Sequence, residues 1–482
     1  MPTLPLAHLT EFYVDGGWME PLGATRLPVH NPSDESVVGE VALGSDDDVH
    51  RAVAAANTAV AAWGSTEPEE RSALLARLAE CYEARMDEMA LAISTEMGSP
   101  IDMALLAQAG AGQFHLRGFV KTLGEMTFDR PLREDRPGDR IRLEPTGVAA
   151  LITPWNWPMN QVTLKVGAAL AAGCTMVLKP SELAPLSSLL FAELVDEAGF
   201  PPGVFNLVNG NGLGVGTALT SHPDVDVVSF TGSTRAGVAV TKAAAPTVKR
   251  VSLELGGKSP NLVFADCDVV EAVRRGAAHC FDNTGQSCNA PTRMLVERSV
   301  YDQAVDLAAE VAATTRCAPA SEPGGHIGPL VSAAQFERVQ ALIKAGIEEG
   351  ARLVEGGPGR PDGLTEGWFV RPTVFADVSP DMRIAREEIF GPVLAMAPFD
   401  SEEEALALAN NTPYGLASYV QTGDAERARR VSAGLRAGMV QVNGAPRAPG
   451  SPFGGYKQSG VGREGGVWGV EEFLETKSVS GL

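Results

Sequence analysis

The chain has 482 residues, of which 44% are hydrophobic and 21% charged, the balance of an ordinary globular protein. A chain this long is expected to form several domains and to bury enough apolar surface to fold without disulfides or a structural metal. Its formal net charge of −21 repels phosphate backbones, so nucleic acid is not an expected partner.

The cysteines and the N-terminus favour a cytoplasmic protein. The six cysteines are scattered and form no C-x-x-C pair, which predicts reduced thiols. The first residues lack the features of a signal peptide, and the most apolar stretch, 162–178, is short for a membrane span and contains Lys165. No membrane contact is therefore expected. The seven histidines show no metal-ligand spacing, so no metal is expected either.

The N-terminal part of the chain predicts two helices. Ser45 followed by three aspartates is typical of a helix start, because acids favour the positive end of the helix dipole. A second helical pattern extends from about Glu69 to Glu96 and is ended by Gly98-Ser-Pro100. The later segment 128–142 is too charged for a core and is either a solvated excursion or an arm used in assembly.

From about residue 147 the pattern alternates between strands and helices. Strands are predicted at 147–153, 175–179, 204–208 and 225–230, and helices at 160–172, 181–198, 212–220 and 234–244. The alternation restarts with strands at 259–264 and 293–297 around a helix at 269–279. Such patterns predict βαβ units, parallel sheets and a doubly wound α/β fold, with a second α/β domain over 255–445.

Glycine-rich turns suggest where a dinucleotide binds. The string Gly460-Val-Gly-Arg-Glu-Gly465 fits G-x-G-x-x-G, but it lies near the C-terminus without a βαβ unit, so we interpret its glycines as turn residues. The turns 210–216 and 230–233 each lead from a strand to a helix. Their backbone N–H groups are better placed for a pyrophosphate.

Three residues suggest covalent chemistry, and each alone is ambiguous. Cys288 follows Gly285-Gln-Ser and is either a nucleophile, which needs a lowered pKa and an oxyanion site, or an inert thiol. Glu254 lies in an apolar strand, where burial would raise its pKa toward that of a general base, or else it forms a salt bridge. Asn156, between two tryptophans, is an oxyanion donor or a turn residue.

Together with their neighbours these residues resemble the aldehyde dehydrogenase superfamily over nearly the whole chain. The similar blocks, in order, are 154–158, 179–182, 199–203, 230–233, 253–260, 285–288, 387–392 and 451–457. The resemblance implies that Cys288 attacks the aldehyde carbon. The Asn156 amide and the Cys288 N–H would hold the oxyanion, and Glu254 would activate the water that hydrolyses a thioester. Members that transfer the acyl group to CoA usually lack this base.

The resemblance also implies a cofactor site for NAD. Lys179 and Glu182 match positions at the adenosine ribose, where a carboxylate would repel the 2′-phosphate of NADP. Glu388 matches the contact with the nicotinamide ribose, and Phe390 lies near the nicotinamide. The complete expected set is Thr153, Trp155, Lys179, Ser181, Glu182, Gly212, Gly216, Phe230, Thr231, Gly232, Ser233, Leu255, Glu388 and Phe390.

The family architecture implies three parts and a homo-oligomer. A dinucleotide-binding domain is expected over 1–123 and 146–254 and a catalytic domain over 255–445. A small β arm with the C-terminal segment is expected over 124–145 and 446–482. Because such an arm pairs with another subunit, a homodimer or homotetramer is expected.

The substrate is expected in a tunnel with polar walls. Matching positions include Trp157, Asn160, Gln161, Leu164, Asp282, Ser287, Asn289 and Phe453. Several are polar where many relatives have aromatic residues, which favours polar or ring-bearing aldehydes over long alkyl ones. Arg447 either binds a distal carboxylate, as in a semialdehyde dehydrogenase, or lies on the surface.

Two other classes of protein fit the sequence less well. A cysteine hydrolase would need a partner histidine, and no Cys–His signature is present. An inactive scaffold would not need Cys288, Glu254 and Asn156 together.

Overall fold

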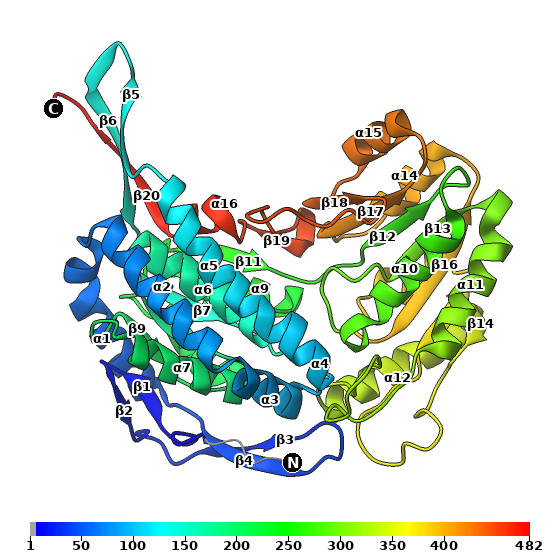
Figure 1. Ribbon diagram of the computed structural model, residues 1–482, viewed down its shortest axis with the longest axis horizontal. Coiled ribbons are helices and arrows are strands. Elements are labelled where there is room, and N and C mark those ends of the chain that lie inside the picture. The colour runs from blue at the N-terminus through cyan, green and yellow to red at the C-terminus, as the bar shows by residue number, and fades with distance from the viewer. Residues whose placement is uncertain (1–5) are drawn as a thin grey trace.

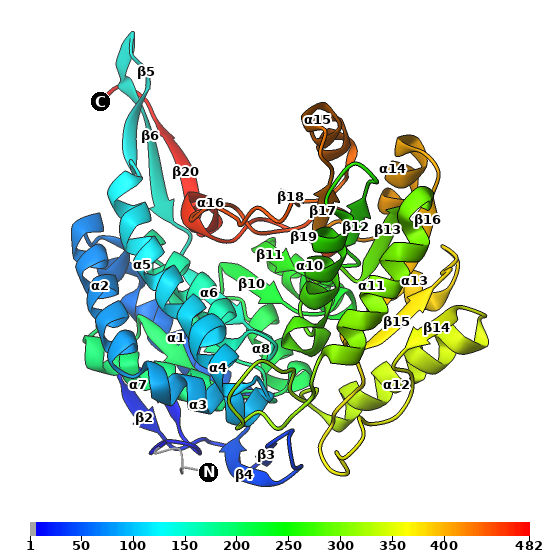
Figure 2. The same ribbon diagram turned by 45° about the vertical axis from the view of Figure 1, so that its right-hand side comes forward.

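The structure is a computed structural model, and it describes residues 6–482. Two β-sheets lie side by side, each between layers of helices (Figures 1 and 2). The first sheet contains, in spatial order, β19 (Gly460–Val461), β11 (Arg250–Glu254), β10 (Val227–Thr231), β7 (Val148–Ile152), β8 (Thr175–Lys179), β9 (Phe205–Leu207), β1 (Phe12–Val14) and β2 (Gly17–Met19). The five central strands, β7 to β11, are parallel. The edge strands β1, β2 and β19 are antiparallel and were not predicted.

The second sheet contains, in spatial order, β14 (Arg352–Glu355), β15 (Thr373–Ala376), β16 (Val393–Phe399), β13 (Arg293–Glu297), β12 (Pro260–Val263), β17 (Ala417–Gln421) and β18 (Met439–Val442). All its strands are parallel except β14. The predicted α/β class is therefore confirmed.

Both faces of the first sheet are buried. Ala149 and Leu151 of β7 pack into one core with α2 (Pro68–Ala84), α3 (Met86–Met97), α5 (Gly110–Glu125), α6 (Pro158–Ala172) and α7 (Leu186–Ala198). The alternate residues Val148 and Ala150 pack into another with α1 (Asp46–Gly64). Alternation of side chains along a strand explains this division. The remaining helices of this half are α8 (Thr217–Ser221) and α9 (Thr234–Ala244).

The second sheet is covered in the same way. On one face lie α10 (Val269–Phe281) and α11 (Tyr301–Thr314), and on the other α14 (Glu402–Asn410) and α15 (Ala425–Gly434). The helices α12 (Ala333–Glu348) and α13 (Arg383–Arg386) pack in a further cluster at one end. No helix within residues 6–482 is long and apolar enough to cross a membrane.

One predicted helix was wrong. The pattern from Glu69 to Glu96 forms two helices, α2 and α3, because the backbone of Arg85 (φ −119°, ψ 26°) is not helical. The Arg85 guanidinium binds Glu88 in α3 and two acids of α7, so its contacts stabilise the break. The helix α3 ends at Gly98, as predicted, and Gly98 has a left-handed conformation. Ser45 caps α1 with Asp48 in a capping box, which also fits the prediction.

The charged segment 128–142 forms a protruding hairpin. Strands β5 (Asp129–Arg133) and β6 (Arg136–Pro145) are joined by β20 (Leu474–Val479) in the order β20-β6-β5. Figures 1 and 2 show this sheet projecting from the body beside the C-terminus. A second small hairpin contains β3 (Arg26–His30) and β4 (Val37–Ala42). The shortest helices are α4 (Ile101–Met103) and α16 (Gly466–Glu471).

The glycines of the G-x-G-x-x-G string are turn residues, as predicted. Gly460, Gly462 and Gly465 all have positive φ, and Gly460 belongs to β19, which pairs antiparallel with β11. This string is therefore not part of a strand-to-helix turn of a βαβ unit.

Candidate active site

The order of the first sheet defines a crevice between β7 and β10. From β7 the chain continues to β8 and β9 on one side, whereas β10 and β11 lie on the other. Ligands of such sheets bind at this switch point, beyond the carboxyl ends of the strands. Of the predicted cofactor residues, Thr153 and Trp155 follow β7, Thr231 ends β10, and Gly232 and Ser233 follow it. The side-chain hydroxyls of Thr153 and Thr231 are buried without a hydrogen-bond partner in the described chain, as expected for groups that await a ligand.

Glu254 ends β11 at the same edge and is 2% exposed. Neither carboxylate oxygen has a hydrogen-bond partner among residues 6–482. Burial, and next the nearby Glu464 carboxylate, raise the pKa of Glu254 well above its usual range, against the opposing effect of Lys165. An unpaired carboxyl with a raised pKa can act as a general base. The alternative that Glu254 forms a salt bridge is wrong, because its carboxylate has no such partner among residues 6–482.

Cys288 lies in the connection from α10 to β13, after an unusual turn. Asn283 (φ 53°) and Thr284 (φ 58°) are both buried and left-handed, and Gly285 (φ 70°) follows them. Left-handed backbone in residues other than glycine costs of order 1–3 kcal/mol each and occurs mainly at functional sites. The Thr284 hydroxyl donates to the Gly328 carbonyl at 2.9 Å, which helps to hold the turn.

Asn156 faces this turn from the segment between β7 and α6. Its side-chain amide donates to the carbonyl of Gln286, 2.9 Å away, two residues before Cys288. The indole N–H of Trp157 donates to the Ser287 hydroxyl at 2.9 Å. The oxyanion candidate and the nucleophile candidate are thus tied together through the backbone.

Burial raises the pKa of the Cys288 thiol, and the carboxylates of Glu388 and Glu254 raise it further. The backbone N–H groups of Cys288 and Asn289 act in the opposite direction. A nucleophilic thiol is expected to have a lowered pKa, and the surroundings of Cys288 do not provide one. A nucleophilic role for Cys288 would therefore require a base to take the thiol proton first.

A cavity of about 640 Å³ opens onto Cys288. Of the predicted substrate residues, Trp157, Gln161, Asn289 and Phe453 line it, and Asp282 does not. Asp282 is exposed at the end of α10. Other lining residues are Phe114, His115, Phe119, Asn160, Leu164, Arg447 and Glu464. The walls thus combine aromatic rings with polar groups.

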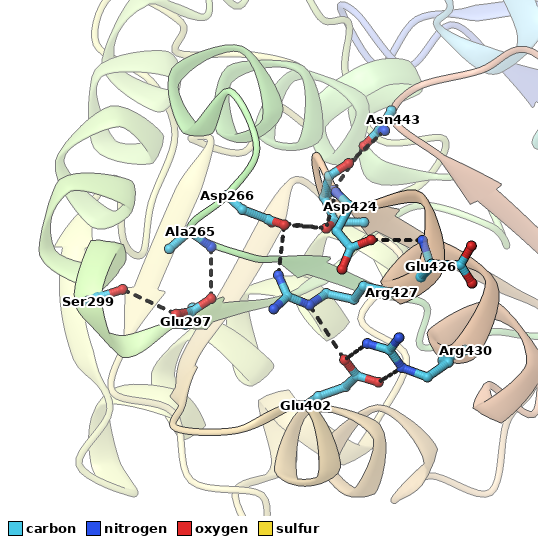
Figure 3. A network of polar contacts seen from close by, with 11 residues as sticks. Ala265, Asp266, Glu297, Ser299, Glu402, Asp424, Glu426, Arg427, Arg430 and Asn443 are labelled. Carbon is cyan, nitrogen blue, oxygen red and sulfur yellow. Dashed lines mark hydrogen bonds and ion pairs between the residues drawn. The ribbon is translucent and has the colours of Figure 1, made fainter.

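Arg447 lies at this cavity, in the loop that follows Asn443. Its guanidinium donates to the Ser451 carbonyl at 2.8 Å and lies 5.1 Å from the Phe453 ring centre. Asn443 anchors the loop, because its side chain bonds both the N–H and the carbonyl of Thr422. Figure 3 shows the network behind this anchor, where Asp266 binds Arg427 at 2.8 Å and accepts from Thr422.

The predicted cofactor residues lie near the same crevice and along β8. Lys179 ends β8, and its ammonium is 3.4 Å from the Glu182 carboxylate. Gly216 lies against the Lys179 stem, and Ser233 caps α9. The Glu388 carboxylate accepts from the Gly257 N–H at 2.9 Å, and burial raises its pKa to about 7.

Of the other predicted cofactor residues, two form a pair of aromatic rings, and the rest lie in the core or in turns. The rings of Phe390 and Trp155 meet edge to face at 5.4 Å. Phe230 and Leu255 are buried in the core beneath α9. Ser181 begins the turn after β8, and Gly232 follows β10. Gly212 begins the short helical turn before α8.

Sequence reasoning missed a buried ion pair beside Glu254. Lys165 of α6 forms this pair with Glu464 and also donates to the Ser229 hydroxyl at 3.1 Å. Both charged side chains are almost completely buried. Only the presence of a lysine in the apolar stretch 162–178 hinted at it. Glu464 also lines the cavity, so the pair connects the cavity wall with Glu254.

The comparisons with known proteins decide the family. The model of the aldehyde dehydrogenase family matches residues 18–479. The chain belongs to the aldehyde dehydrogenase family. This confirms the resemblance inferred from the sequence blocks.

Relatives in this family match along almost the full chain. A 3-succinoylsemialdehyde-pyridine dehydrogenase from a Pseudomonas species is 52% identical over 472 residues, which are 98% of each protein. The crystal structure of an aldehyde dehydrogenase from Bartonella henselae is 53% identical with a TM-score of 0.97, covering 98% of this chain and 99% of that one. A mutant aldehyde dehydrogenase C from Pseudomonas syringae, solved with NAD+ and octanal, is 52% identical with a TM-score of 0.96, covering 98% and 96%.

Proposed function

We propose that this enzyme oxidises an aldehyde to a carboxylic acid with NAD, using Cys288 as nucleophile and Glu254 as the base that activates water. The observation that supports it best is that the buried, unpaired Glu254 carboxyl acts electrostatically on Cys288, which itself lines the cavity. After its thiol proton has passed to water in the cavity, the Cys288 sulfur would add to the aldehyde carbon, and the Asn156 amide and the Cys288 N–H would donate to the resulting oxyanion. Water activated by Glu254 would then cleave the thioester and release the acid.

The residues at the crevice fit a dinucleotide. The N-terminus of α9 at Ser233 offers N–H groups to a pyrophosphate, and the unpaired hydroxyls of Thr153 and Thr231 lie at the switch point. Glu182 and Lys179 would bind the adenosine ribose, with Glu182 favouring NAD over NADP. NAD is present in the structure of the 52% identical Pseudomonas syringae relative, which supports this choice. Bound there, it would take up the hydride that the Cys288 adduct must lose to become a thioester.

Arg447 supports a second candidate, a semialdehyde dehydrogenase. Its guanidinium lines the cavity, and the Pseudomonas relative is named for a semialdehyde that bears a pyridine ring. The octanal bound to the Pseudomonas syringae relative supports alkyl aldehydes instead. Both classes fit a cavity with aromatic and polar walls.

One aldehyde panel tests both candidates. NADH or NADPH formation is followed with hexanal, octanal, benzaldehyde and succinic semialdehyde, for the wild type and for Cys288→Ala. No absorbance change with any aldehyde would refute the proposed activity. Arg447→Ala should lower kcat/KM for succinic semialdehyde relative to hexanal, and an unchanged ratio would refute the carboxylate contact. Arg117→Ala is the matched control, because Arg117 lines the same cavity but is paired with Glu83.

We further propose a homo-oligomer, either dimer or tetramer, in the cytoplasm. The exposed sheet β20-β6-β5 leaves strand edges that a second copy can pair, and all six cysteines, each within the described chain, are free thiols. In the same scheme, NAD binds to a domain made of residues 1–123 and 146–254, and Cys288 lies in a domain made of residues 255–445. The assembly arm consists of residues 124–145 and 446–482. Light scattering after size-exclusion chromatography tests the assembly, and a monomer mass would refute it.

A further inference from the structure

The turn before Cys288 is held by an amide from a distant helix. Gln108 lies in a π-helical segment, Ala104–Ala109, between α4 and α5, and its side chain is completely buried. Its Nε2 donates to the Asn283 side-chain oxygen at 3.1 Å and to the Asn156 carbonyl at 3.2 Å. Single π-turns inside α-helices occur frequently at functional sites.

Asn283 in turn contacts both Asn156 and the segment that leads to Cys288. Its side-chain amide donates to the Asn156 carbonyl at 2.9 Å and to the Gln286 carbonyl at 3.3 Å. The Asn156 amide donates to that same Gln286 carbonyl at 2.9 Å. Gln108, Asn283, Asn156 and Gln286 therefore form one closed set of amide contacts around the segment that precedes Cys288.

The left-handed backbone of Asn283 explains why a brace is needed. A non-glycine residue at φ 53° persists only where its surroundings determine its conformation. Without Gln108, the buried Asn283 oxygen would lose its donor, and the Asn283 amide would be free to rotate. Because that amide holds both Asn156 and Gln286, the oxyanion donor and the sulfur of Cys288 would shift relative to each other.

We infer that Gln108 is a positioning residue, which sets the geometry of Cys288 relative to Asn156 through Asn283. The inference rests on the proposed role of Cys288. The Nε2 group has two hydrogens and meets two oxygen acceptors, with the Met97 sulfur 3.7 Å away as a weaker third, so a side chain with a donating amide at this length satisfies both oxygens. Gln108 touches neither substrate nor cofactor in this scheme.

The test compares Gln108→Met with Gln340→Met. Gln340 is also buried in a helix and also makes two hydrogen bonds, both to Gly359, which is not part of the site. We expect Gln108→Met to lower kcat by about 10- to 100-fold while KM for NAD stays within about twofold. Alkylation of Cys288 by iodoacetamide, read by mass spectrometry, should slow and its pH midpoint should rise. The reason is that a displaced Cys288 sulfur would move away from the backbone N–H groups of Cys288 and Asn289, which lower its pKa.

Gln340→Met should lower the midpoint of thermal unfolding without changing kcat or the alkylation profile. If Gln108→Met behaves in the same way, the inference is wrong. Asn283→Gly is a second variant, because glycine keeps the positive φ but removes the acceptor of Gln108. It should slow alkylation and lower kcat, and a wild-type profile would equally overturn the inference.

A double variant separates this role from a general packing effect. Because Gln108 also donates directly to the Asn156 carbonyl, Gln108→Met should still lower kcat in the Asn283→Gly background, but by a clearly smaller factor than in the wild type. A full additive loss would contradict the inference. Failure of the proposed function is distinguishable, because alkylation of Cys288 needs neither aldehyde nor NAD. If Cys288→Ala retained NADH formation, the nucleophile would be wrong whatever the alkylation of Gln108→Met showed.

Discussion

The carbonyl oxygen of Cys288 lies against Gly257, in the space that a Cβ atom on Gly257 would occupy. The preceding residue, Gly256, lies in the same way against the Glu388 carboxylate. These two glycines connect β11, which ends in Glu254, with β12 of the second sheet. The proposed base, the proposed nucleophile and a predicted cofactor contact therefore meet at one short link between the sheets.

This link predicts that two neighbouring glycines respond differently to the same substitution. Gly257→Ala places a methyl against backbone that cannot move away, so we expect kcat to fall by about 100-fold. Gly256→Ala meets only the end of the Glu388 side chain, so KM for NAD should rise while kcat changes less. Steady-state kinetics of both variants check this. The interpretation fails if the two variants lose kcat equally.

Glu254→Gln should separate the two halves of the reaction. The amide keeps the volume of the carboxylate but cannot accept a proton from water, so thioester hydrolysis should slow by about 100- to 1,000-fold. Stopped-flow measurement should still show a burst of about one NADH per active site. Glu310→Gln, an exposed acid paired with Arg274, is the control and should behave as the wild type. Loss of the burst would assign Glu254 to an earlier step.

The buried pair beside Glu254 predicts two opposite pH shifts. The Glu464 carboxylate raises the pKa of Glu254 and the Lys165 ammonium lowers it. A base must be ionised to work, so the acid limb of kcat against pH follows this pKa. Glu464→Gln should move the limb to lower pH and Lys165→Met to higher pH. Glu472→Gln, whose carboxylate has a weaker effect of the same sign, should give a smaller shift toward lower pH. Shifts in the reverse directions would rule out this electrostatic coupling.

Cofactor choice should depend on Glu182. Glu182→Gln removes the carboxylate that repels a 2′-phosphate and keeps the nearby Lys179 ammonium, which also donates to the Pro180 carbonyl at 2.7 Å and can attract the phosphate. We expect the ratio of kcat/KM for NADP to that for NAD to rise by about tenfold. Glu193→Gln, on the following helix and paired with Arg85, should leave the ratio unchanged. An unchanged ratio in Glu182→Gln would place the ribose elsewhere.

Much of the fold could be predicted, because local signals and tertiary structure agree over most of it. The strands β7, β8 and β10 are apolar runs bounded by turns, and their positions differ from the prediction by a few residues at most. The break at Arg85 could not be predicted, because no glycine or proline marks it and acids from α7 hold it. The antiparallel strands β1 and β19 are three and two residues long and depend on sheet edges formed by distant segments.

The candidate site was predictable only where a motif exists. Cys288, Glu254 and Asn156 lie in recognisable blocks, whereas Lys165, Glu464 and Gln108 have no local pattern and become visible only through their contacts. For Asp282, in contrast, a match in sequence position suggested a contact that the structure does not have. A matching position predicted a cavity contact, yet its side chain is exposed and does not line the cavity.

The pairing of β19 with β11 has a consequence for protein synthesis. The strand that ends in Glu254 is completed by Gly460 and Val461, and Phe453 and Glu464 form part of the cavity wall. Almost the whole chain must therefore be synthesised before Glu254, the proposed base, is surrounded by the residues that contact it in the folded protein. A nascent or C-terminally truncated chain would have Cys288 but no closed cavity around it, so reactivity toward aldehydes should arise only once translation is nearly finished.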